Sequence, residues 1–457
     1  MSGIHIPAAS AVMKFGGTSV EDAPAFARAA ALVAGEAERS LPVVVTSAMG
    51  GGTDTLVGAV RAAAEGAPRP AALEPLWERH RAVAAALLGE AERARFLAAL
   101  EEARERTGVL LGVVAEHPGT RRALHDEVVS QGERLASRLL AGVLAERGVR
   151  AAWVDARECI RTDDEYTRAA PLPGPTAEST RARLLPLLEA GTAPVLGGFI
   201  GSTLQGATTT LGRGGSDFTA ALVGAAIGAA EVQIWTDVSG FLTADPRVVG
   251  EARSIGRLSY AEAAELAYFG AKVLHPRTIQ PAVEHEIPVR IRNSRAPGSG
   301  ETWIDARAER SPQGIKAIAH KGGVTVVQVT SARMLGAYGF LRAIFEVFDR
   351  HRTAVDIVAT SEVSVSLTVD DAAHLDAIVA ELEAFGEVRV EPGHAIVCVV
   401  GEGLRGTSGI AAKVFGTLAD VNVTLISQGA SSLNLTFVVG EDAVAGAVRR
   451  LHAAFFG

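Results

Sequence analysis

The amino-acid sequence predicts an α/β protein in which a helix-covered β-sheet is followed by two small βαββαβ modules. The first observation behind this prediction is that short β-rich runs ending in glycines alternate with helical stretches through residues 1–300. This alternation is typical of an α/β sheet that binds ligands at the carboxyl ends of its strands. The second observation is an internal repeat in the last third of the chain, with the strand and helix order of a small ligand-sensing module.

The bulk composition limits the classes of protein that fit. The 457 residues are 48% hydrophobic and 21% charged, with a formal net charge of −8, so the chain can bury a large core and is not disordered. An acidic chain is a poor match for a nucleic-acid groove or a polybasic membrane patch, and we expect neither partner.

Cysteine usage and the lack of targeting segments indicate the compartment. Cys159 and Cys398 lie far apart in sequence, which indicates a reducing environment, and no Cys/His cluster has the spacing of a metal site. The first residues lack a basic, apolar leader, and the apolar run at 220–230 is too short to cross a bilayer. We therefore expect a cytoplasmic protein.

The first domain is expected to span residues 1–300. Its opening elements are a strand, a helix and a second strand, at Val12–Phe15, Ala25–Arg39 and Leu41–Thr46. Residues 56–118 carry apolar side chains at helical spacing and predict a helical layer or excursion. Further strands are expected at Ala151–Asp155, Ala193–Gly197, Val232–Trp235 and Val289–Ile291. The Pro/Gly-rich segment 295–300 marks the edge of this domain.

The C-terminal repeat aligns at a shift of 70 residues. Gly339–Phe345 in the first copy matches Gly409–Phe415 in the second, and the strands that follow match at the same shift. We expect the first copy at 322–391 and the second at 392–457. The second copy lacks a last strand, whereas a strand-like run at 315–320 precedes the first copy without a partner. We therefore infer that this run completes the sheet of the second copy, with the first copy inserted within it.

The most informative stretch is the glycine-rich loop Leu211–Thr219. Its glycines interleave with Arg213, and Ser216 and Asp217 precede a helix of small residues. Glycine lets the backbone approach a ligand closely, Ser and Asp are frequent N-caps, and a helix start offers free N–H groups and a positive dipole end. Arg213 adds a guanidinium that can hold a carboxylate or phosphate through two bonds. The loop thus predicts an anion cradle, a carboxylate clamp and an acidic group.

Six motifs, in order along the chain, resemble those of the aspartokinase family. They are Lys14–Ser19, Gly132–Arg134, Leu211–Asp217, Trp235–Asp237, Asp245–Arg247 and Phe269–Pro276. The C-terminal repeats are similar to the paired ACT domains of that family, and the match covers the chain from Val12 to its end. The resemblance implies a three-layer α/β/α amino-acid-kinase fold with a C-terminal pair of ACT domains. It also implies ATP-dependent phosphorylation of the side-chain carboxylate of L-aspartate.

The acceptor carboxylate in this reaction is already ionised at neutral pH, so the site has to align and neutralise two anions and needs no general base. No Gly-x4-Gly-Lys-[Ser/Thr] sequence is present, which excludes a P-loop enzyme. The resemblance assigns catalysis to Lys14, which would reach the transferring phosphate, and to Asp217, which would orient Lys14. The alternatives are a solvated strand-end lysine and a plain N-cap. The resemblance assigns the substrate α-carboxylate to Arg213 and the ammonium to Glu133, against a structural clamp and an exposed helix charge.

The implied substrate site also includes Ser47, Thr53 and Ser216, with ordinary turn chemistry as the alternative for the first two. The expected cofactor is ATP with Mg2+ carried by the nucleotide, and the protein itself is expected to hold no metal. Leu242 stands where such sequences often carry Tyr, so an aromatic or hydroxyl contact to the nucleotide is lost. The implied nucleotide contacts are Lys14, Gly16, Gly17, Thr236, Asp237, Leu242, Arg247 and Lys272.

The first ACT copy is expected to bind the effector, because its motifs resemble the lysine-inhibited, monofunctional branch of the family. A lysine pocket needs buried acids and N–H donors from a strand–helix turn. The first copy carries Asp356 and Glu362 where the second has Thr424 and Ser432. The alternative is that both acids are solvated strand-end charges. Ala337 stands where a serine is usual in this branch. The expected effector residues are Met334, Ala337, Gly339, Phe340, Leu341, Val355, Asp356, Thr360, Ser361 and Glu362.

The ACT pair also predicts assembly and control. ACT sheets that join edge to edge remove exposed strand edges, and we expect a homodimer or a dimer of dimers. Lysine is expected to stabilise a state in which the ACT pair disturbs the substrate loops. Two alternatives stay open. One is a kinase of the same fold that acts on acetylglutamate, glutamate or carbamate, although Glu133 with Arg213 favours a free α-amino acid. The other is a non-catalytic amino-acid sensor, against which Lys14, Arg213 and Asp217 argue.

Overall fold

The structure is a computed structural model that describes residues 10–270, 273–307, 309–312 and 314–457. The chain divides into two compact units. The first comprises Met1–Phe241 and Val273–Ala306, and the second comprises Leu242–Lys272 and Arg307–Gly457. This division differs from a single boundary near residue 300. None of the helices in the described ranges is both long and apolar enough to cross a bilayer.

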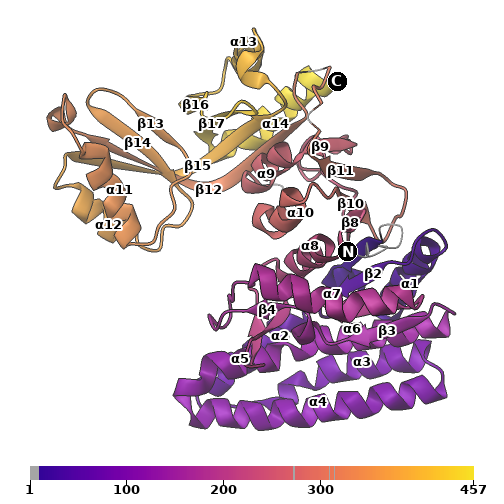
Figure 1. The fold of residues 1–457 in the computed structure, drawn as a ribbon. Coiled ribbons are helices and arrows are strands. Elements are labelled where there is room, and N and C mark those ends of the chain that lie inside the picture. The colour runs from indigo at the N-terminus through magenta and orange to yellow at the C-terminus, as the bar shows by residue number, and fades with distance from the viewer. Residues whose placement is uncertain (1–9, 271–272, 308, 313) are drawn as a thin grey trace, which may run out of the picture. The chain divides into compact units, whose positions relative to one another are not determined.

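The first unit follows the alternation of strands and helices that the sequence predicts (Figure 1). Its strands are β1 (Ala11–Phe15), β2 (Val43–Thr46), β3 (Ala151–Val154), β4 (Arg161–Thr162), β5 (Ala193–Gly197), β6 (Ile200–Thr203), β7 (Thr208–Thr210), β8 (Glu231–Thr236), β10 (Val289–Asn293) and β11 (Glu301–Asp305). Its helices are α1 (Ala23–Ala37), α2 (Gly52–Ala64), α3 (Glu74–Leu87), α4 (Glu90–Glu116), α5 (Arg121–Val129), α6 (Gln131–Glu146), α7 (Pro173–Glu189), α8 (Gly215–Ile227) and α10 (Gln280–Glu284).

The main sheet of this unit has the strand order β3-β5-β2-β1-β8-β10-β11. Neighbouring strands are parallel except for β11, which runs antiparallel to β10. Val12, Met13 and Val43 are fully buried because helices cover both faces of a parallel sheet. The carboxyl ends of β1, β2, β5 and β8 therefore meet at one edge, which is where a doubly wound sheet binds ligands.

Alternation along β1 sends successive side chains to opposite faces of the sheet. Met13 and Phe15 join the larger hydrophobic core with residues of α1 and α6. Val12 faces α8, since a Cβ added to Gly224 of that helix would lie 3.9 Å from Val12 Cγ2. Lys14 shares the face of Val12 and lies near the end of the strand, so its side chain is directed to the first turn of α8.

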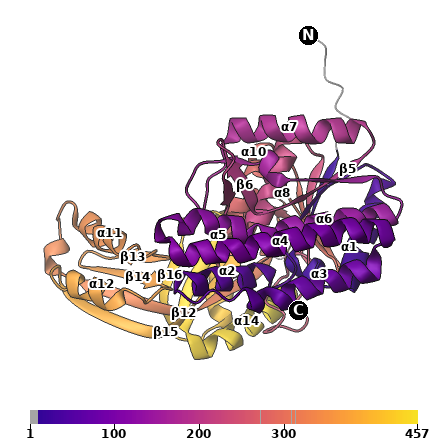
Figure 2. The same ribbon diagram turned by 90° about the horizontal axis from the view of Figure 1, so that it is seen from below.

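Helices lie in layers on both sides of the sheet, which confirms the predicted three-layer α/β/α arrangement (Figure 2). On one face α8 packs against β1, β2 and β8, and α7 and α10 pack against α8. On the other face α6 covers β2, β3 and β5, with α1 beside it. Helices α3 and α4 pack outside α6, so the periodic stretch at 56–118 forms a further helical layer.

The second unit begins with a segment that lies within the expected first domain, at residues 242–270. Thr243 O accepts a hydrogen bond of 2.9 Å from Ile318 N, and Ala244 and Val249 lie in the same hydrophobic cluster as Phe455. These contacts explain why residues 242–270 belong to this unit. Its elements are β9 (Arg257–Ser259), α9 (Tyr260–Tyr268), β12 (Ala317–Thr330), α11 (Phe340–Arg350), β13 (Val358–Thr360), β14 (Ser364–Val369), α12 (Leu375–Leu382), β15 (Glu387–Val400), α13 (Ile410–Thr417), β16 (Val423–Gln428), β17 (Asn434–Gly440) and α14 (Glu441–Phe456).

The two repeats form one antiparallel six-stranded sheet in the order β13-β14-β12-β15-β17-β16. Both repeats share the long strands β12 and β15. The first part of β12, Ala317–Lys321, pairs with the last part of β15, which in turn pairs with β17. The second part, Thr325–Thr330, pairs with β14 and with the first part of β15. The run at 315–320 thus leads into the sheet of the second copy, which is the pairing that the repeat implies.

Candidate active site

A cleft of about 500 Å³ opens at the carboxyl edge of the main sheet. Its walls come from the ends of β1 and β2, from α2, α5 and α6, and from the glycine-rich loop before α8. Every residue that the sequence assigns to catalysis or to substrate binding lines this cleft. These residues are Lys14, Ser47, Thr53, Glu133, Arg213, Ser216 and Asp217.

Lys14 and Asp217 form an ion pair inside the cleft, with Nζ and Oδ1 2.7 Å apart. Their side chains are only 11% and 13% exposed. Asp217 lies in the first turn of α8, where a carboxylate also suits the positive end of the helix dipole. A Cβ on Gly16 would lie 3.5 Å from Lys14 Nζ, so the ammonium lies over the glycine turn that follows β1. Because an ammonium has three N–H groups, it can still donate to phosphate oxygens while it pairs with Asp217.

The glycine-rich loop presents Arg213 at the edge of the cleft. Gly212 and Gly214 flank it with φ of 75° and 73°, in the left-handed region that favours glycine. A Cβ on Gly214 would lie 2.6 Å from Thr278 Cγ2, so the loop keeps this path only with glycine there. Arg213 is exposed and has no ion pair or hydrogen bond within the described part of the chain. Its guanidinium is therefore available to an anion.

Glu133 is a buried acid with one unpaired oxygen. The residue is 2% exposed, and its Oε1 accepts hydrogen bonds of 3.3 Å from Ala48 N and Thr53 Oγ1. Its Oε2 is buried and has no hydrogen-bond partner among the described residues. Burial raises the pKa of this carboxyl group to about 7. A desolvated carboxylate without a counter-ion favours a bound cation, so a ligand ammonium gains most binding free energy at this oxygen.

Ser47 and Ser216 join the wall that lies between β2 and α8. Ser47 Oγ donates to Ser216 Oγ at 2.9 Å. A Cβ on Gly198 would lie 2.7 Å from Ser216 Cα, so the first turn of α8 packs directly on the end of β5. The free N–H groups at this helix start and two hydroxyls thus border the same cleft.

The first unit carries four of the residues predicted to bind the nucleotide. Gly16, Gly17, Thr236 and Asp237 follow or end the neighbouring strands β1 and β8. Gly16 N donates to Trp235 O at 3.1 Å, which joins the two strand ends. The four residues therefore lie at the switch point of the sheet, next to Lys14.

The other predicted nucleotide residues belong to the second unit or lie outside the described ranges. Leu242 is partly buried, and its backbone forms an isolated bridge with Ser254. Arg247 is exposed and pairs with Asp245 at 2.6 Å, so its guanidinium is not free. Lys272 lies outside the described residues.

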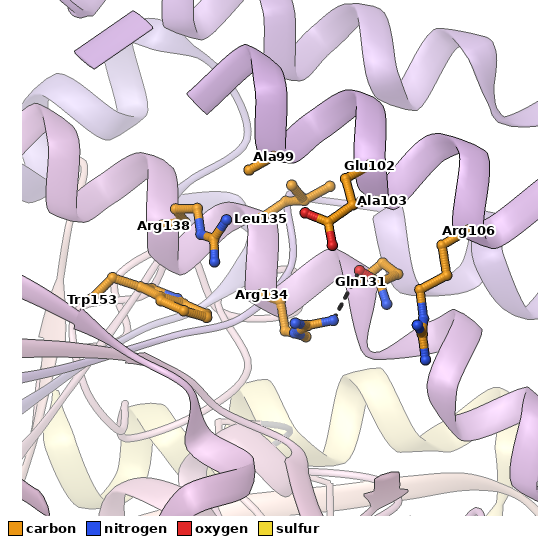
Figure 3. A pocket seen from close by; sticks show the side chains of 9 residues that line it. All are labelled: Ala99, Glu102, Ala103, Arg106, Gln131, Arg134, Leu135, Arg138 and Trp153. Carbon is orange, nitrogen blue, oxygen red and sulfur yellow. Dashed lines mark hydrogen bonds between the residues drawn. The ribbon is translucent and has the colours of Figure 1, made fainter. Parts of the chain in front are cut away.

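Arg134 follows Glu133 in α6 but faces a different cavity. It lines a hollow of about 90 Å³ beside α4, where its Nη1 donates to Gln131 Oε1 at 3.3 Å (Figure 3). In the same hollow Arg138 stacks on Trp153, with Cζ 4.0 Å from the ring centroid. The Arg138–Trp153 contact joins α6 to β3, and Arg134 Nη2 lies 3.5 Å from Asp155 Oδ2 just after that strand, so both arginines secure the helix that carries Glu133.

Sequence reasoning missed four polar residues of the cleft: Asp54, His125, Thr167 and Thr210. Behind the last three lies Asp126, which is fully buried and whose Oδ2 accepts hydrogen bonds of 2.9 and 2.8 Å from Thr167 N and Thr210 N. Asp126 therefore ties two separate chain segments to α5. A polar pair such as His125-Asp126 within a charged helix normally lies in solvent, and only the fold reveals that it faces the substrate cleft.

In the second unit, the acid expected to bind the effector is already paired. The Asp356 side chain is 2% exposed, its carboxylate oxygens lie 3.1 Å from Lys321 Nζ, and Oδ1 accepts a 2.5 Å hydrogen bond from the Tyr268 hydroxyl. Lys321 also pairs with Asp370 at 2.6 Å. Asp356 is thus neither a solvated strand-end charge nor an unpaired acid.

The other expected effector residues lie on the first repeat. Met334, Phe340 and Val355 pack against one hydrophobic cluster, and Gly339 caps α11 with φ of 79°. Glu362 is exposed between β13 and β14, and no ion pair or hydrogen bond joins it to another described residue. The remaining positions are also exposed: Ala337, Leu341, Thr360 and Ser361.

Comparisons with known proteins agree with this architecture. The model of the amino acid kinase family matches residues 10–293, and an ACT domain model matches residues 397–455. The chain is 42% identical to lysine-sensitive aspartokinase 3 of Escherichia coli, over 97% of this chain and 99% of that protein. It is 38% identical to the chloroplastic aspartokinase 1 of Arabidopsis thaliana, over 97% and 80%.

Solved structures give the same result. The crystal structure of E. coli aspartokinase III in complex with aspartate and ADP is 40% identical, with a TM-score of 0.82 over 98% of this chain and 100% of that chain. The aspartate kinase of Clostridium acetobutylicum is 29% identical, with a TM-score of 0.83 over 97% and 100%. Together with the site geometry, these matches confirm the resemblance, and the chain belongs to the aspartokinase family.

Proposed function

We propose that this chain transfers the γ-phosphoryl group of ATP to the side-chain carboxylate of L-aspartate, which gives 4-phospho-L-aspartate. The observation that carries this proposal is the placement of a buried, unpaired carboxylate oxygen on Glu133 in one cleft with Arg213 and Lys14. A free α-amino acid offers one ammonium and one α-carboxylate to the first two residues. Its side-chain carboxylate is then left to meet the phosphoryl group near the third.

Glu133 and Arg213 orient the substrate. The ammonium of aspartate binds the unpaired Oε2 of Glu133, which replaces solvent as its counter-ion. The free guanidinium of Arg213 holds the α-carboxylate in a bidentate pair. Thr53 and Ser47 border the same space with their hydroxyl groups. Fixing both ends of the amino acid aligns the acceptor oxygen, and alignment is the main requirement of a phosphoryl transfer between two anions.

Lys14 neutralises charge that develops on the transferred phosphoryl oxygens, and Asp217 holds the ammonium in place through their 2.7 Å ion pair. Gly16, Gly17, Thr236 and Asp237 border the nucleotide from the adjoining strand ends. The lack of a side chain at each glycine leaves the backbone N–H groups accessible to phosphate oxygens.

We infer that Mg2+ reaches the site on the nucleotide. No group of three or more His, Cys, Asp or Glu side chains that could hold a metal ion occurs among the described residues. Mg2+ bound to nucleotide phosphates keeps most of its water and needs no protein cage, so this cleft fits a metal held in that way. When bound, the ion would neutralise phosphate charge beside Lys14.

We further propose that L-lysine regulates the enzyme through the first repeat. The E. coli relative is named lysine-sensitive and has been crystallised in complex with lysine and aspartate. In this chain Asp356 is the buried acid of the region and Glu362 is an exposed one. The two acids would serve the two ammonium groups of lysine, with the turn at Gly339 as a source of N–H donors.

Assembly is proposed to occur through the repeats. Strands β13 and β16 form the two edges of the six-stranded sheet, and Val358 on β13 is 38% exposed. Edge strands with free backbone groups pair readily with a second copy. We propose a homodimer or a dimer of dimers, and light scattering with and without lysine measures which one forms.

A hydroxamate assay with ATP tests the proposed activity. Aspartate, acetylglutamate, glutamate and carbamate are compared as acceptors, with each candidate amino acid then added as an inhibitor. Turnover of aspartate alone is expected. Preferential turnover of another acid would replace the proposed substrate, and lysine binding without any ATP turnover would instead identify a non-catalytic sensor.

A further inference from the structure

His125 lines the substrate cleft from α5, and its side chain is 22% exposed. Its Nδ1 lies 3.0 Å from Asp126 Oδ1. A carboxylate only accepts hydrogen bonds, so Nδ1 carries the proton of this bond. Because Asp126 is fully buried and His125 lines the cleft, the second ring nitrogen, Nε2, is the one that remains for a ligand.

The carboxylate behind the ring is saturated with donors. Asp126 is fully buried, and it accepts hydrogen bonds from His125 Nδ1, from Thr210 N and Oγ1, and from Thr167 N. Among the described residues, His125 is the only ion-pair partner of this buried acid. The pair thus holds the imidazole in one orientation, with little freedom to turn away from the cleft.

The same network holds a strained residue in the cleft wall. Thr167 has φ of 74°, which is unfavourable for a β-branched side chain, and its N–H bond to Asp126 helps to keep it there. A Cβ on Gly212 would lie 3.5 Å from Thr167 O, so this wall packs against the loop that carries Arg213. Strain that is maintained beside a ligand cleft usually serves to position groups.

We propose that His125, protonated on both ring nitrogens, is a second anchor for the α-carboxylate of the substrate, with Nδ1–H donating to Asp126 and Nε2–H donating to the substrate. The inference rests on the proposed function and adds a contact to it. Glu133 and Asp54 also line the cleft, so the ammonium of the substrate is attracted to these two acids and its anionic end to Arg213 and His125. The alternative is that His125 only stabilises the wall through Asp126.

Two substitutions separate these roles, because the amide nitrogen of Asn overlays Nδ1 and that of Gln overlays Nε2. His125→Asn keeps the bond to Asp126 and loses the cleft donor, whereas His125→Gln keeps a cleft donor and loses the bond to Asp126. His117→Asn, at an exposed histidine outside the cleft, is the matched control.

For His125→Asn we expect the KM for aspartate to rise about tenfold with kcat within about twofold, since the lost bond is made equally in ground and transition states. His125→Gln should stay within about threefold of the unmodified enzyme in KM, because one donor to a charged group is retained. A wild-type KM in His125→Asn, or a raised KM in His125→Gln alone, would show that His125 only stabilises the cleft wall through Asp126. Either result would overturn the proposal.

The α-amide of L-aspartate, which lacks the α-carboxylate charge, provides the second measurement. The ratio of KM values between His125→Asn and the unmodified enzyme should fall from about ten with aspartate to about one with this analogue. A ratio that stays at about ten would overturn the contact. If the variants melt early, the analogue still tests the unmodified protein: aspartate should shift the His125 Nε2 resonance and the amide should not. Failure of the proposed function looks different, because the unmodified enzyme would then not phosphorylate aspartate at all.

Discussion

Replacement of Glu133 by Gln should stabilise the ligand-free protein at alkaline pH while it weakens aspartate binding. The carboxyl group is buried, its Oε2 has no hydrogen-bond partner among the described residues, and burial raises its pKa from the ordinary 4.5 to about 7. The difference of about 2.5 pKa units corresponds to about 3 kcal/mol, with each unit worth about 1.4 kcal/mol. This is an upper value, because the glutamine amide must itself find a partner in the same space.

The direction in which the unfolding free energy changes with pH follows from proton binding to Glu133. Between pH 4.5 and 7 the folded protein keeps a proton on Glu133 that the unfolded chain has released. Stability from this group is therefore fully present below pH 4.5 and is lost as the pH rises through 7. The glutamine variant has no such loss. Its advantage in unfolding free energy should be near zero at pH 4.5 and should grow to about 3 kcal/mol at pH 8.

Urea denaturation of both proteins at pH 5, 6, 7 and 8 measures this difference, with Glu146→Gln as a control at an exposed glutamate of the same helix. Saturating aspartate should stabilise the unmodified protein far more than the variant, because its ammonium supplies the missing counter-ion. The KM for aspartate should rise by about 100-fold in the variant, the cost of about 3 kcal/mol for a buried charge pair. A difference in stability that does not change with pH would refute the reasoning.

Three further changes test other parts of the structure. Lys14→Met should lower kcat by about 10³-fold and leave the KM for aspartate within about threefold, in steady-state assays, because its charge acts on the transferred phosphoryl group. Gly214→Ala should destabilise the protein by about 2 kcal/mol or more in thermal melting, since its φ is 73° and the new Cβ would lie 2.6 Å from a threonine methyl. Gly206→Ala, at φ of 89° in open space, should cost only about 1 kcal/mol, and equal losses would contradict the clash. Lys321→Met should lower the lysine concentration for half inhibition about tenfold, because it frees Asp356 for the effector, and an unchanged value would remove that exchange from the mechanism.

Most of the fold prediction rested on patterns among residues that are close together in sequence. Strand–glycine–helix alternation is local, so the strand that carries Lys14 and the loop around Arg213 follow from the sequence. The carboxyl ends of parallel strands meet at one edge, and this rule alone brings such residues into one cleft. The repeat at 70 residues likewise depends on equivalent local signals, as the left-handed glycines Gly339 and Gly409 before α11 and α13 illustrate.

Features set by long-range packing could not be predicted. The segment 242–270 reads as part of the first domain, but its hydrogen bond to Ile318 and its packing in the second unit's core are contacts across more than 60 residues of sequence. His125 stayed hidden for the same reason. Its partner Asp126 is adjacent in sequence. However, Asp126 is held in the cleft wall by hydrogen bonds from Thr210 in β7, which lies over 80 residues later.

Glu133 and Asp356 show why the partner of a buried carboxylate, and not burial alone, decides what it binds. Glu133 leaves Oε2 unpaired, so a ligand ammonium recovers most of the desolvation cost. Asp356 already pairs with Lys321 and accepts a hydrogen bond from the Tyr268 hydroxyl. A ligand ammonium that binds there replaces the Lys321 ammonium, so the net gain in binding free energy is small. An amino acid with a single ammonium group therefore gains little at Asp356. A diamine such as lysine can add a second contact at the exposed Glu362, which would favour it over aspartate at the regulatory repeat while aspartate remains favoured at Glu133.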